Sequence, residues 1–350
     1  MRVLVISTDR TLLDTESTVF RRHQKYAREF DALDVLVMGG RRQVSEGNLH
    51  IHGVVSMFPL MRGCSALLRA LRLPRPDVVT SQDPFENGLV GLLIAWWRSV
   101  PLHIQVHTDF LSTGFIQHSF VNRIRRVIAG YVLPRASGIR VVSESVRDSL
   151  QATRYTLPAI SVLPIFVDVQ RYADLTRTKH PRFKIAILWV GRLEKEKCPL
   201  YAIQVLENVR RQGHDAGLTI VGSGQEEEVL KYYARERGLE RFVEFVGYQT
   251  DLSPYFAAAD LLLVTSVYEG YGMAMIEALA AGIPVLSTDV GVAREAGAMV
   301  TERKKMARAL LDWISHGPRK SELHAYPYAS EDEYVRAWCE DIQRSQKPKK

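Results

Sequence analysis

Residues 261–288 predict four elements in close succession: a strand, a loop, a helix and a second strand. Leu261–Val264 is an apolar run typical of a buried strand, and a helix is expected over Met273–Ala281. Gly282 can end that helix in the left-handed conformation, and Pro284 just beyond prevents it from continuing. Strands that alternate with helices are typical of a parallel sheet, so this segment restricts the chain to the α/β folds.

The same alternation of short apolar runs and amphipathic segments extends along the rest of the chain. The strands expected before residue 175 are Arg2–Ser7, Ala32–Met38, His52–Met57, Asp77–Thr80, Leu102–Val106, Gly138–Val142 and Ser161–Leu163. The helices expected between them are Ser17–Phe30, Cys64–Leu71, Asn87–Trp97, Phe120–Leu133 and Ser143–Ala152. After residue 183 the expected strands are Ile185–Val190, Gly217–Val221, Phe242–Phe245, Leu261–Val264 and Pro284–Thr288. The helices expected there are Pro199–Gln212, Glu226–Gly238, Leu252–Ala258, Met273–Ala281, Val300–Ser315 and Glu331–Gln346.

The length of 350 residues is too great for one ordinary domain and predicts two. The segment Thr176–Phe183 is polar and contains a proline, so we expect the linker there. The predicted domains are residues 1–175 and 183–328, followed by a final helix over 329–346. That helix has Ser330 and Glu333 in the spacing of a capping box.

The composition is that of a soluble globular protein, with 46% apolar and 24% charged residues. No apolar run reaches the length of about 18 residues that a transmembrane helix needs. The longest run, Leu89–Trp97, is expected to form a buried helix. Met1–Ile6 is expected to be a first strand, because it lacks the cleavage pattern of a signal peptide. The three scattered cysteines, Cys64, Cys198 and Cys339, favour a reducing cytoplasm and no disulfide framework.

The net charge of +7 is concentrated in the first half of the chain. Residues 1–175 contain 21 Lys and Arg against 15 Asp and Glu, whereas residues 176–350 contain 25 against 24. Two tracts, 50–76 and 110–143, contain arginines and no acids. Nucleic acid is a disfavoured partner, because the aromatic residues do not alternate with the arginines as base-stacking platforms.

Two carboxylates occupy unusual places in the segment 261–288. Glu269 lies in the loop before the helix, where exposed N–H groups attract anions, so it either caps the helix or serves a ligand. Glu277 lies about one turn inside the helix among apolar residues, and a buried carboxylate needs a polar partner. Gly270 and Gly272 let the backbone approach a ligand closely. A nucleotide-linked sugar suits this loop, with phosphates at the helix start and hydroxyl groups on the carboxylates.

A glycine and two cations follow the strand Ile185–Val190. Gly191 gives a turn, and Arg192 and Lys197 can both lean over the start of the next helix. The two cations either bind a diphosphate together or belong to a solvated charge run, because Glu194 and Glu196 lie between them.

Two further turns follow later strands. Gly222, Ser223 and Gly224 form a G-x-G turn, which either approaches a ligand or is simply tight. It is not a nicotinamide-binding fingerprint, because the third glycine of that motif is missing. Val246 and Gly247 end the following strand, where they can lie along a planar base.

Taken in this order, the four motifs closely resemble those of the retaining GT-B glycosyltransferases of family GT4. The resemblance covers residues 185–296 and is most specific at Glu269 and Glu277, an E-x7-E pair followed by G-x-P-V. It is fainter in the first half, at Asp83-Pro84 and at His107. The family has an α/β GT-B fold, in which two Rossmann-like domains face one another across a cleft. The resemblance implies that the first domain holds the acceptor, that the second holds a nucleotide sugar, and that the C-terminal helix returns to the first domain.

The resemblance also implies an activity and a set of site residues. The enzyme would move a hexosyl unit, with retention of configuration, from a UDP- or GDP-linked sugar to a glycan or lipid-linked acceptor in envelope or exopolysaccharide synthesis. Arg192 and Lys197 would neutralise the donor diphosphate, Glu277 would hold the ribose hydroxyls, and Glu269 would face the donor sugar. The implied catalytic residues are His107, Glu269, Arg192 and Lys197. The implied donor-binding residues are Gly191, Arg192, Lys197, Gly222, Ser223, Val246, Gly247, Glu269, Gly270, Tyr271, Gly272, Met273 and Glu277.

No metal and no cofactor besides the nucleotide sugar are expected, because the sequence has no D-x-D triplet and no clustered His/Cys set. Cations and a helix dipole would stabilise the leaving diphosphate instead. The sequence departs from the family in three places. Ser7–Thr11 lacks a glycine pair, Cys198 stands where glycine is common, and residues 296–300 run almost directly into a helix where relatives have a longer loop.

The first domain contains an amphipathic segment over residues 115–132. Its apolar residues recur at helical spacing, and Arg123, Arg125 and Arg126 fall on other faces. The segment is either an ordinary solvated helix or a surface that rests on an anionic membrane. The expected location is the cytoplasm, either free or peripheral on the inner face of the plasma membrane. A nucleotide-sugar epimerase of the same fold and a non-catalytic GT-B partner subunit remain open as alternative functions.

Overall fold

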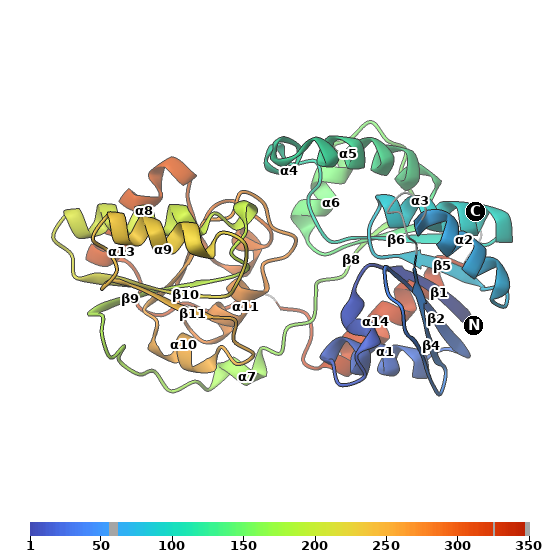
Figure 1. Cartoon of the computed structure of the whole chain (residues 1–350), viewed down its shortest axis with the longest axis horizontal. Helices are drawn as coiled ribbons and strands as arrows, with labels where there is room; N and C mark the ends of the chain where they lie inside the picture. Colours follow the sequence, from blue (N-terminus) through green and yellow to red (C-terminus); the bar gives the residue numbers. More distant parts are fainter. Residues whose placement is uncertain (56–61, 325, 347–350) are drawn as a thin grey trace. The chain divides into compact units, whose positions relative to one another are not determined.

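The computed structural model describes residues 1–55, 62–324 and 326–346, which form two compact units. The first unit combines Met1–Pro164 with the chain from Tyr328 onward, and the second unit is Ile165–Pro327 (Figure 1). The division between them comes earlier in the chain than the expected limit at residue 175. The expected linker 176–183 belongs to the second unit, because the Thr178 N–H donates a hydrogen bond of 2.9 Å to the Ala257 carbonyl oxygen within that unit.

The first unit is built on an eight-stranded sheet in the order β3-β4-β2-β1-β5-β6-β7-β8. All neighbouring strands are parallel except β3 and β4, which are antiparallel. The strands are β1 (Arg2–Ser7), β2 (Ala32–Met38), β3 (Gln43–Glu46), β4 (Leu49–Val54), β5 (Val78–Ser81), β6 (Leu102–Val106), β7 (Gly138–Val141) and β8 (Ile160–Val162). Strand β3 was not expected from the sequence. Residues 56–57 of the expected strand His52–Met57 lie outside the described residues.

Helices cover both faces of this sheet. They are η1 (Arg10–Leu13), α1 (Thr18–Arg28), α2 (Arg62–Arg72), α3 (Glu86–Arg98), α4 (Thr113–His118), α5 (Phe120–Val132), η3 (Leu133–Arg135), α6 (Glu144–Gln151) and α14 (Glu331–Arg344). Neighbouring residues of β6 show the two faces. Leu102 lies beside Gly91 of α3, whereas the next residue, His103, bonds Asp341 of α14. The α2, α3 and α5 helices pack side by side, while α1 packs against α14 (Figure 1).

A buried group of polar residues joins the sheet of the first unit to α14. His103 Nε2 lies 3.0 Å from Asp341 Oδ2, and Ser161 Oγ donates a hydrogen bond to the other carboxylate oxygen. Arg140 is fully buried and donates to Gln105 Oε1 at 2.9 Å and to the Tyr334 hydroxyl at 3.2 Å. We call these residues, together with the Leu163 carbonyl that also accepts from Arg140, the α14 network.

The second unit has a fully parallel six-stranded sheet in the order β11-β10-β9-β12-β13-β14. Its strands are β9 (Ile185–Val190), β10 (Ala216–Val221), β11 (Val243–Gly247), β12 (Leu261–Val264), β13 (Val285–Ser287) and β14 (Met299–Val300). The order is that of a doubly wound Rossmann sheet, in which the winding direction reverses between β9 and β12. Ligands of such sheets bind at that reversal, beyond the carboxyl ends of the strands.

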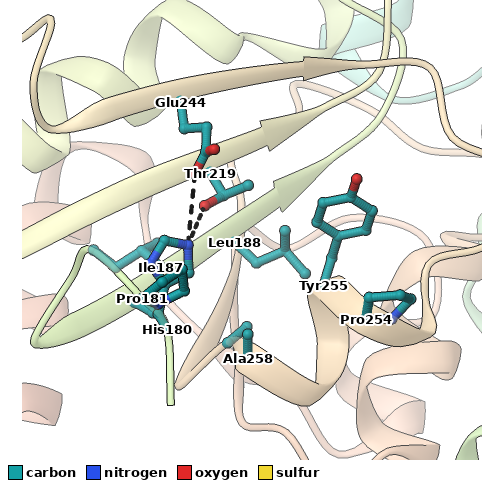
Figure 2. Close-up of a pocket in the computed structure, with 11 residues that line it drawn as sticks. His180, Pro181, Ile187, Leu188, Thr219, Glu244, Pro254, Tyr255 and Ala258 are labelled. Carbon is teal, nitrogen blue, oxygen red and sulfur yellow. Dashed lines mark hydrogen bonds and ion pairs between the residues drawn. The ribbon is translucent and has the colours of Figure 1, made fainter. Parts of the chain in front are cut away.

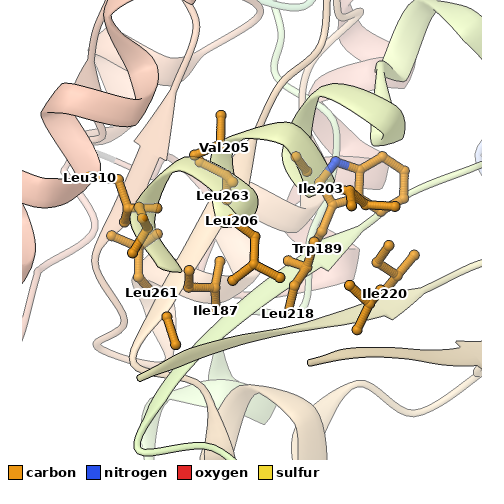
Figure 3. Packing of buried hydrophobic residues seen from close by; sticks show 14 of the residues in the cluster. Ile187, Trp189, Ile203, Val205, Leu206, Leu218, Ile220, Leu261, Leu263 and Leu310 are labelled. Carbon is orange, nitrogen blue, oxygen red and sulfur yellow. The ribbon is translucent and has the colours of Figure 1, made fainter. Parts of the chain in front are cut away.

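Helices also cover this sheet on both faces. They are α7 (Gln170–Ala173), η4 (Lys195–Lys197), α8 (Pro199–Arg211), α9 (Glu227–Glu236), α10 (Ser253–Ala258), α11 (Met273–Ala280), α12 (Ala293–Ala296), η5 (Arg303–Lys305) and α13 (Met306–His316). Figure 3 shows the core on one face, where Ile187 and Trp189 of β9 and Leu218 of β10 pack with residues of α8 and α13. Aliphatic side chains from consecutive parallel strands account for this core, because such strands are buried on both faces.

Three sequence predictions about the elements are wrong. The helix expected over Val300–Ser315 begins at Met306, and Val300 instead ends the edge strand β14. Residues 296–300 therefore do not run directly into a helix, because the short helix α12 and strand β14 come first. The run Leu89–Trp97 does form a helix, but it is buried on one side only, and Trp96 and Trp97 at its end are exposed. Within the described ranges, no helix is long and apolar enough to cross a membrane.

Candidate functional site

The loops that follow β9 and β12 meet at the reversal point of the second sheet. Lys197, at the end of η4, extends its Nζ to within 2.5 Å of Glu269 Oε2, and Ser266 Oγ donates to Glu269 Oε1 at 2.7 Å. The Lys197 and Glu269 side chains are both largely buried. One of the two interpretations of Glu269 was that it caps α11. It does not, because its carboxylate faces the Lys197 ammonium group and the Ser266 hydroxyl.

Backbone and hydroxyl contacts hold these two loops together beneath the ion pair. Thr265 Oγ1 donates to the carbonyl oxygens of Lys197 and Cys198 at 3.0 and 2.9 Å, and it accepts from Trp189 Nε1 at 3.1 Å. The Val267 N–H donates to the Glu196 carbonyl at 2.8 Å. Lys197 is consequently positioned by contacts between the loops that follow β9 and β12, and it does not belong to a solvated charge run.

Cys198 adopts the left-handed conformation, with φ 50°. Its N–H donates to the Lys195 carbonyl at 3.2 Å, and Pro199 then begins α8. A left-handed residue without glycine's freedom is strained. This conformation favours glycine, which fits the expectation that glycine is common at this position in the family.

The glycines after β9 and β10 serve a close approach between two loops. A Cβ on Gly222 would lie 1.8 Å from the Gly191 carbonyl oxygen, and one on Gly224 would lie 2.5 Å from that of Leu193. The Leu193 N–H also donates to the Ser223 carbonyl at 2.9 Å. These contacts support the interpretation of the G-x-G segment as a tight turn.

The loop before α11 places backbone N–H groups at the same edge of the sheet. Gly272 is left-handed, with φ 96°, and no side chain caps the first N–H groups of α11 at Met273. Tyr271 is buried, and its carbonyl accepts from the Val292 N–H at 3.0 Å. At the other end of the helix, the left-handed Gly282 is confirmed, with φ 73°. The uncapped start of α11 is a local positive potential suited to an anion.

Glu277 is a partly buried carboxylate on α11. Burial raises the pKa of Glu277 to about 7, and the nearby positive charge of Arg171 opposes that rise. Within the residues that the structure describes, no side chain forms a hydrogen bond or an ion pair with Glu277. Arg171 itself is paired with Asp251 at 2.7 Å. Sequence reasoning missed Arg171, because only the packing of the short helix α7 against α11 brings it near Glu277.

The other residues predicted to bind the donor lie at the same edge of the sheet. The Arg192 side chain is 71% exposed and pairs with Glu196 at 3.0 Å, so its guanidinium is accessible. Gly270 lies in the loop between Glu269 and α11. Val246 and Gly247 end β11, where the Gly247 carbonyl accepts from the Gly222 N–H at 2.9 Å. The two glycines thus fasten the carboxyl ends of β10 and β11 together.

The second unit contains several cavities. A groove of about 600 Å³ opens beyond β12, β13 and β14 and includes Ser266, the partner of Glu269. Another, about 240 Å³, lies between the sheet and α10, where Glu244 and Thr219 both face His180 (Figure 2). None of the predicted site residues lines this second cavity. No cluster of three potential metal-ligating side chains is present in the described part of the chain.

In the first unit, His107 directly follows the carboxyl end of β6. Burial, together with the charge of Arg140, lowers the pKa of His107 to about 3, so its imidazole is neutral at ordinary pH. Two carboxylates lie nearby in the chain. Asp83 follows β5, the strand that pairs with β6, and Asp109 lies just beyond His107. Burial raises the pKa of both Asp83 and Asp109, although backbone N–H groups donate to each of them.

Comparisons with known proteins agree with this architecture. The family described as "Glycosyl transferases group 1" matches residues 174–316, and the family described as "Glycosyl transferase 4-like domain" matches residues 13–165. The two matches together take in most of both units. The chain belongs to the GT-B glycosyltransferases of the GT4 type.

Individual relatives are distant. A glycogen synthase of Mycobacterium tuberculosis is 29% identical over 228 residues, which are 63% of this chain and 54% of the relative. An Escherichia coli UDP-Gal:alpha-D-GlcNAc-diphosphoundecaprenol alpha-1,3-galactosyltransferase is 25% identical over 251 residues, which are 67% and 64% of the two chains. The matches therefore span between half and two thirds of the length of these relatives. The crystal structure of Anabaena HepE in complex with UDP and glucose superposes with a TM-score of 0.66 at 17% identity and covers 98% of this chain and 95% of the other.

Proposed function

We propose that this protein is a retaining hexosyltransferase that uses a nucleotide-diphosphate sugar, UDP- or GDP-linked, and a glycan or lipid-linked acceptor. The observation that carries the proposal is the arrangement around α11. Glu269 is paired there with the largely buried Lys197, whereas the partly buried Glu277 has no hydrogen-bond or ion-pair partner among the described residues. The ribose hydroxyls of a nucleotide would supply the hydrogen bonds that Glu277 lacks.

The donor diphosphate would bind at the uncapped start of α11 and draw on Lys197, which contacts Glu269 in the loop before that helix. A phosphate there competes with Glu269 for Lys197, and Arg192 is accessible to contribute a second cation. Charge stabilisation of the departing diphosphate is the main catalytic contribution expected of these groups. No metal is needed for that role in this proposal.

Glu269 would then accept hydrogen bonds from hydroxyls of the donor sugar. Its carboxylate is already fixed by Ser266, so release of Lys197 to the phosphate leaves it oriented. Val246 and Gly247 would flank the base. His107 of the first unit is also proposed to be catalytic, and its low pKa suits it to act as a neutral hydrogen-bonding group.

The acceptor is proposed to belong to envelope or exopolysaccharide synthesis. The Escherichia coli relative is named for transfer to a diphosphoundecaprenol-linked sugar, which supports a lipid-linked acceptor. An anionic membrane surface on the cytoplasmic side is the corresponding partner, because the excess positive charge lies in the first half of the chain.

A thermal-shift panel of nucleotide sugars tests the donor directly, because a ligand that binds only the folded state raises its melting temperature. We expect UDP- or GDP-sugars to stabilise the wild type and to stabilise Glu277→Ala much less. Product analysis with donor alone then separates a transferase from an epimerase, which converts the donor without an acceptor. No stabilisation by any nucleotide sugar would leave the non-catalytic subunit as the better description.

A further inference from the structure

The outer face of α5 in the first unit is apolar. Phe120, Ile124, Val127 and Tyr131 recur at spacings of four, three and four residues, which places them on one side of the helix. That side is exposed: Phe120 and Val127 are each 73% accessible to solvent. The opposite side of the same helix carries its buried residues, among them Ala129. An ordinary solvated helix has the reverse arrangement, so the solvated reading of this segment does not describe it.

The neighbouring helix α3 has a second exposed apolar row. Trp96 is 76% and Trp97 61% accessible, and Leu93 one turn earlier is also exposed. The inner side of α3 packs on the sheet through Gly91 and Ile94. Because α3 and α5 pack against each other, the two rows lie on adjacent helices of one face of the first unit (Figure 1). Large exposed apolar areas of this kind mark an interaction surface.

The charged residues of α3 and α5 are arginines with a single exception. Among the residues of α3 and α5, the only acid is Glu86, and its carboxylate is neutralised by Arg125 at 2.9 Å. Arg123 and Arg126 project from the flank of the α5 row, and neither has an acidic partner in the part of the chain that the structure describes. The surface therefore combines exposed tryptophan and tyrosine with uncompensated arginine.

We propose that the exposed rows of α3 and α5 insert into the interface of an anionic lipid bilayer. Tryptophan and tyrosine favour the boundary between headgroups and acyl chains, and arginine is attracted to anionic headgroups. Aromatic and arginine side chains also occur together at protein interfaces, so occupation of this surface by a protein is the alternative outcome of the test below. This proposal rests on the membrane partner of the proposed function and assigns the contact with that membrane to particular side chains. It concerns membrane binding in the absence of the donor.

Cosedimentation of the full chain with vesicles tests this surface. One set contains phosphatidylglycerol and phosphatidylcholine in equal parts, and the other contains phosphatidylcholine alone. We expect the wild type to bind the anionic vesicles and to bind the neutral ones more weakly. Replacement of Trp96 and Trp97 by serine, or of Phe120 and Val127 by serine, should weaken binding about tenfold or more. Arg123→Gln with Arg126→Gln should weaken it about tenfold on anionic vesicles only.

The second unit offers a matched control. Val229 and Tyr232 on α9 are 54% and 62% accessible, and serine at both positions removes similar exposed apolar area from a different helix. This variant should bind vesicles as the wild type does. The melting temperature and its increase with UDP, measured for every variant, show whether the fold and the donor site are intact. If the wild type bound neither UDP nor GDP, the proposed function would be contradicted and the vesicle result would be unaffected.

Tryptophan fluorescence gives an independent measure of insertion. Of the five tryptophans, Trp189, Trp313 and Trp338 are buried, so a change on vesicle addition reports Trp96 and Trp97. We expect a blue shift of the emission and quenching by brominated lipid, both absent from the double tryptophan variant. The proposal is overturned if the wild type does not bind anionic vesicles, or if the serine variants bind as well as it does. A lipid-free dimer that these variants dissociate would show instead that a second copy covers the surface.

Discussion

Asp341 in the first unit and Glu277 in the second are both carboxylates withdrawn from water, and their surroundings differ. Burial alone would raise the pKa of Asp341, but hydrogen bonds from His103 and Ser161 hold it below its ordinary value. Burial raises the pKa of Glu277 to about 7, and no hydrogen bond opposes that rise. The α14 network contains its own partners and is complete without a ligand. Glu277 on α11 lacks a hydrogen-bonding partner, and we interpret this as evidence that a ligand supplies one.

The first test of this contrast removes the centre of the α14 network. Arg140→Ala leaves the Leu163 carbonyl without its donor, removes one of the two donors to Gln105 Oε1 and opens a cavity. We therefore expect the first unit to lose about 3–5 kcal/mol of unfolding free energy. Hydrogen exchange of the β7 amides measures that loss. Arg192→Ala, at an exposed position, should change the unfolding free energy by less than about 0.5 kcal/mol. If donor affinity falls along with the stability in Arg140→Ala, the two regions are not independent.

The second test removes the cation of the donor site. Lys197→Ala should lower kcat/KM by about 10²–10³, because a buried charge that stabilises the departing diphosphate is lost. The reaction rate with a donor identified by thermal shift measures this effect. Lys231→Ala on α9 breaks another lysine–glutamate pair, with Glu227 at 2.7 Å, and serves as the matched control. Equal rates in the two variants would refute the assigned role of Lys197.

The third test concerns the unpartnered carboxylate. The pKa of Glu277 is higher in the folded protein than the ordinary glutamate value of 4.5, so the folded state binds its proton more tightly. Its contribution to stability is complete below the unfolded pKa and is lost as pH rises through about 7. Glu277→Gln should therefore stabilise the protein by about 1–3 kcal/mol at pH 8, with the gain disappearing below pH 5.

The same substitution should weaken nucleotide binding by roughly tenfold, because a neutral amide accepts hydrogen bonds less strongly than a carboxylate. Urea unfolding at several pH values and titration with UDP give the two quantities. A variant that is more stable and also binds UDP as well as the wild type would show that Glu277 has no role in the donor site.

The smallest expected effect is at Cys198. Its left-handed conformation is strained, so Cys198→Gly should stabilise the second unit by about 0.5–1 kcal/mol with little change in rate. Gly222→Ala provides the reverse case, since its Cβ would collide with the Gly191 carbonyl. A loss of stability in Cys198→Gly would mean that the thiol makes contacts worth more than the strain. Thermal unfolding in the presence of a reductant measures both changes.

The sequence predicted those elements that hydrophobic pattern determines. β1, β2, β6, β9 and β12 have the predicted bounds, because apolar residues occupy most positions of each strand. Strand β3 and edge strand β14 escaped prediction, since both are short and polar or half-exposed and their identity depends on a neighbouring strand. Trp96 and Trp97 were assigned to the interior because composition does not show which side of an apolar helix faces the sheet.

The candidate site was predictable to a similar degree. The sequence placed Glu269, Lys197 and Glu277 in loops and a helix that the fold brings to one end of the sheet. It did not show that Glu269 pairs with Lys197, or that Arg171 lies near Glu277, because both depend on contacts between segments far apart in the chain. The glycines at 222 and 224 were associated with a ligand or a tight turn, and only the structure shows the loop that approaches them.

The position of α14 has a consequence for biosynthesis. Residues from Tyr328 onward complete the first unit, yet all of the second unit is translated before them. Throughout that interval Arg140 and His103 have no Tyr334 or Asp341 to bond, and the side of the sheet that α14 will cover is open to solvent and to chaperones. The second unit is continuous in the sequence and can fold as soon as it leaves the ribosome. The part of the polypeptide made first is therefore the part whose folding finishes last.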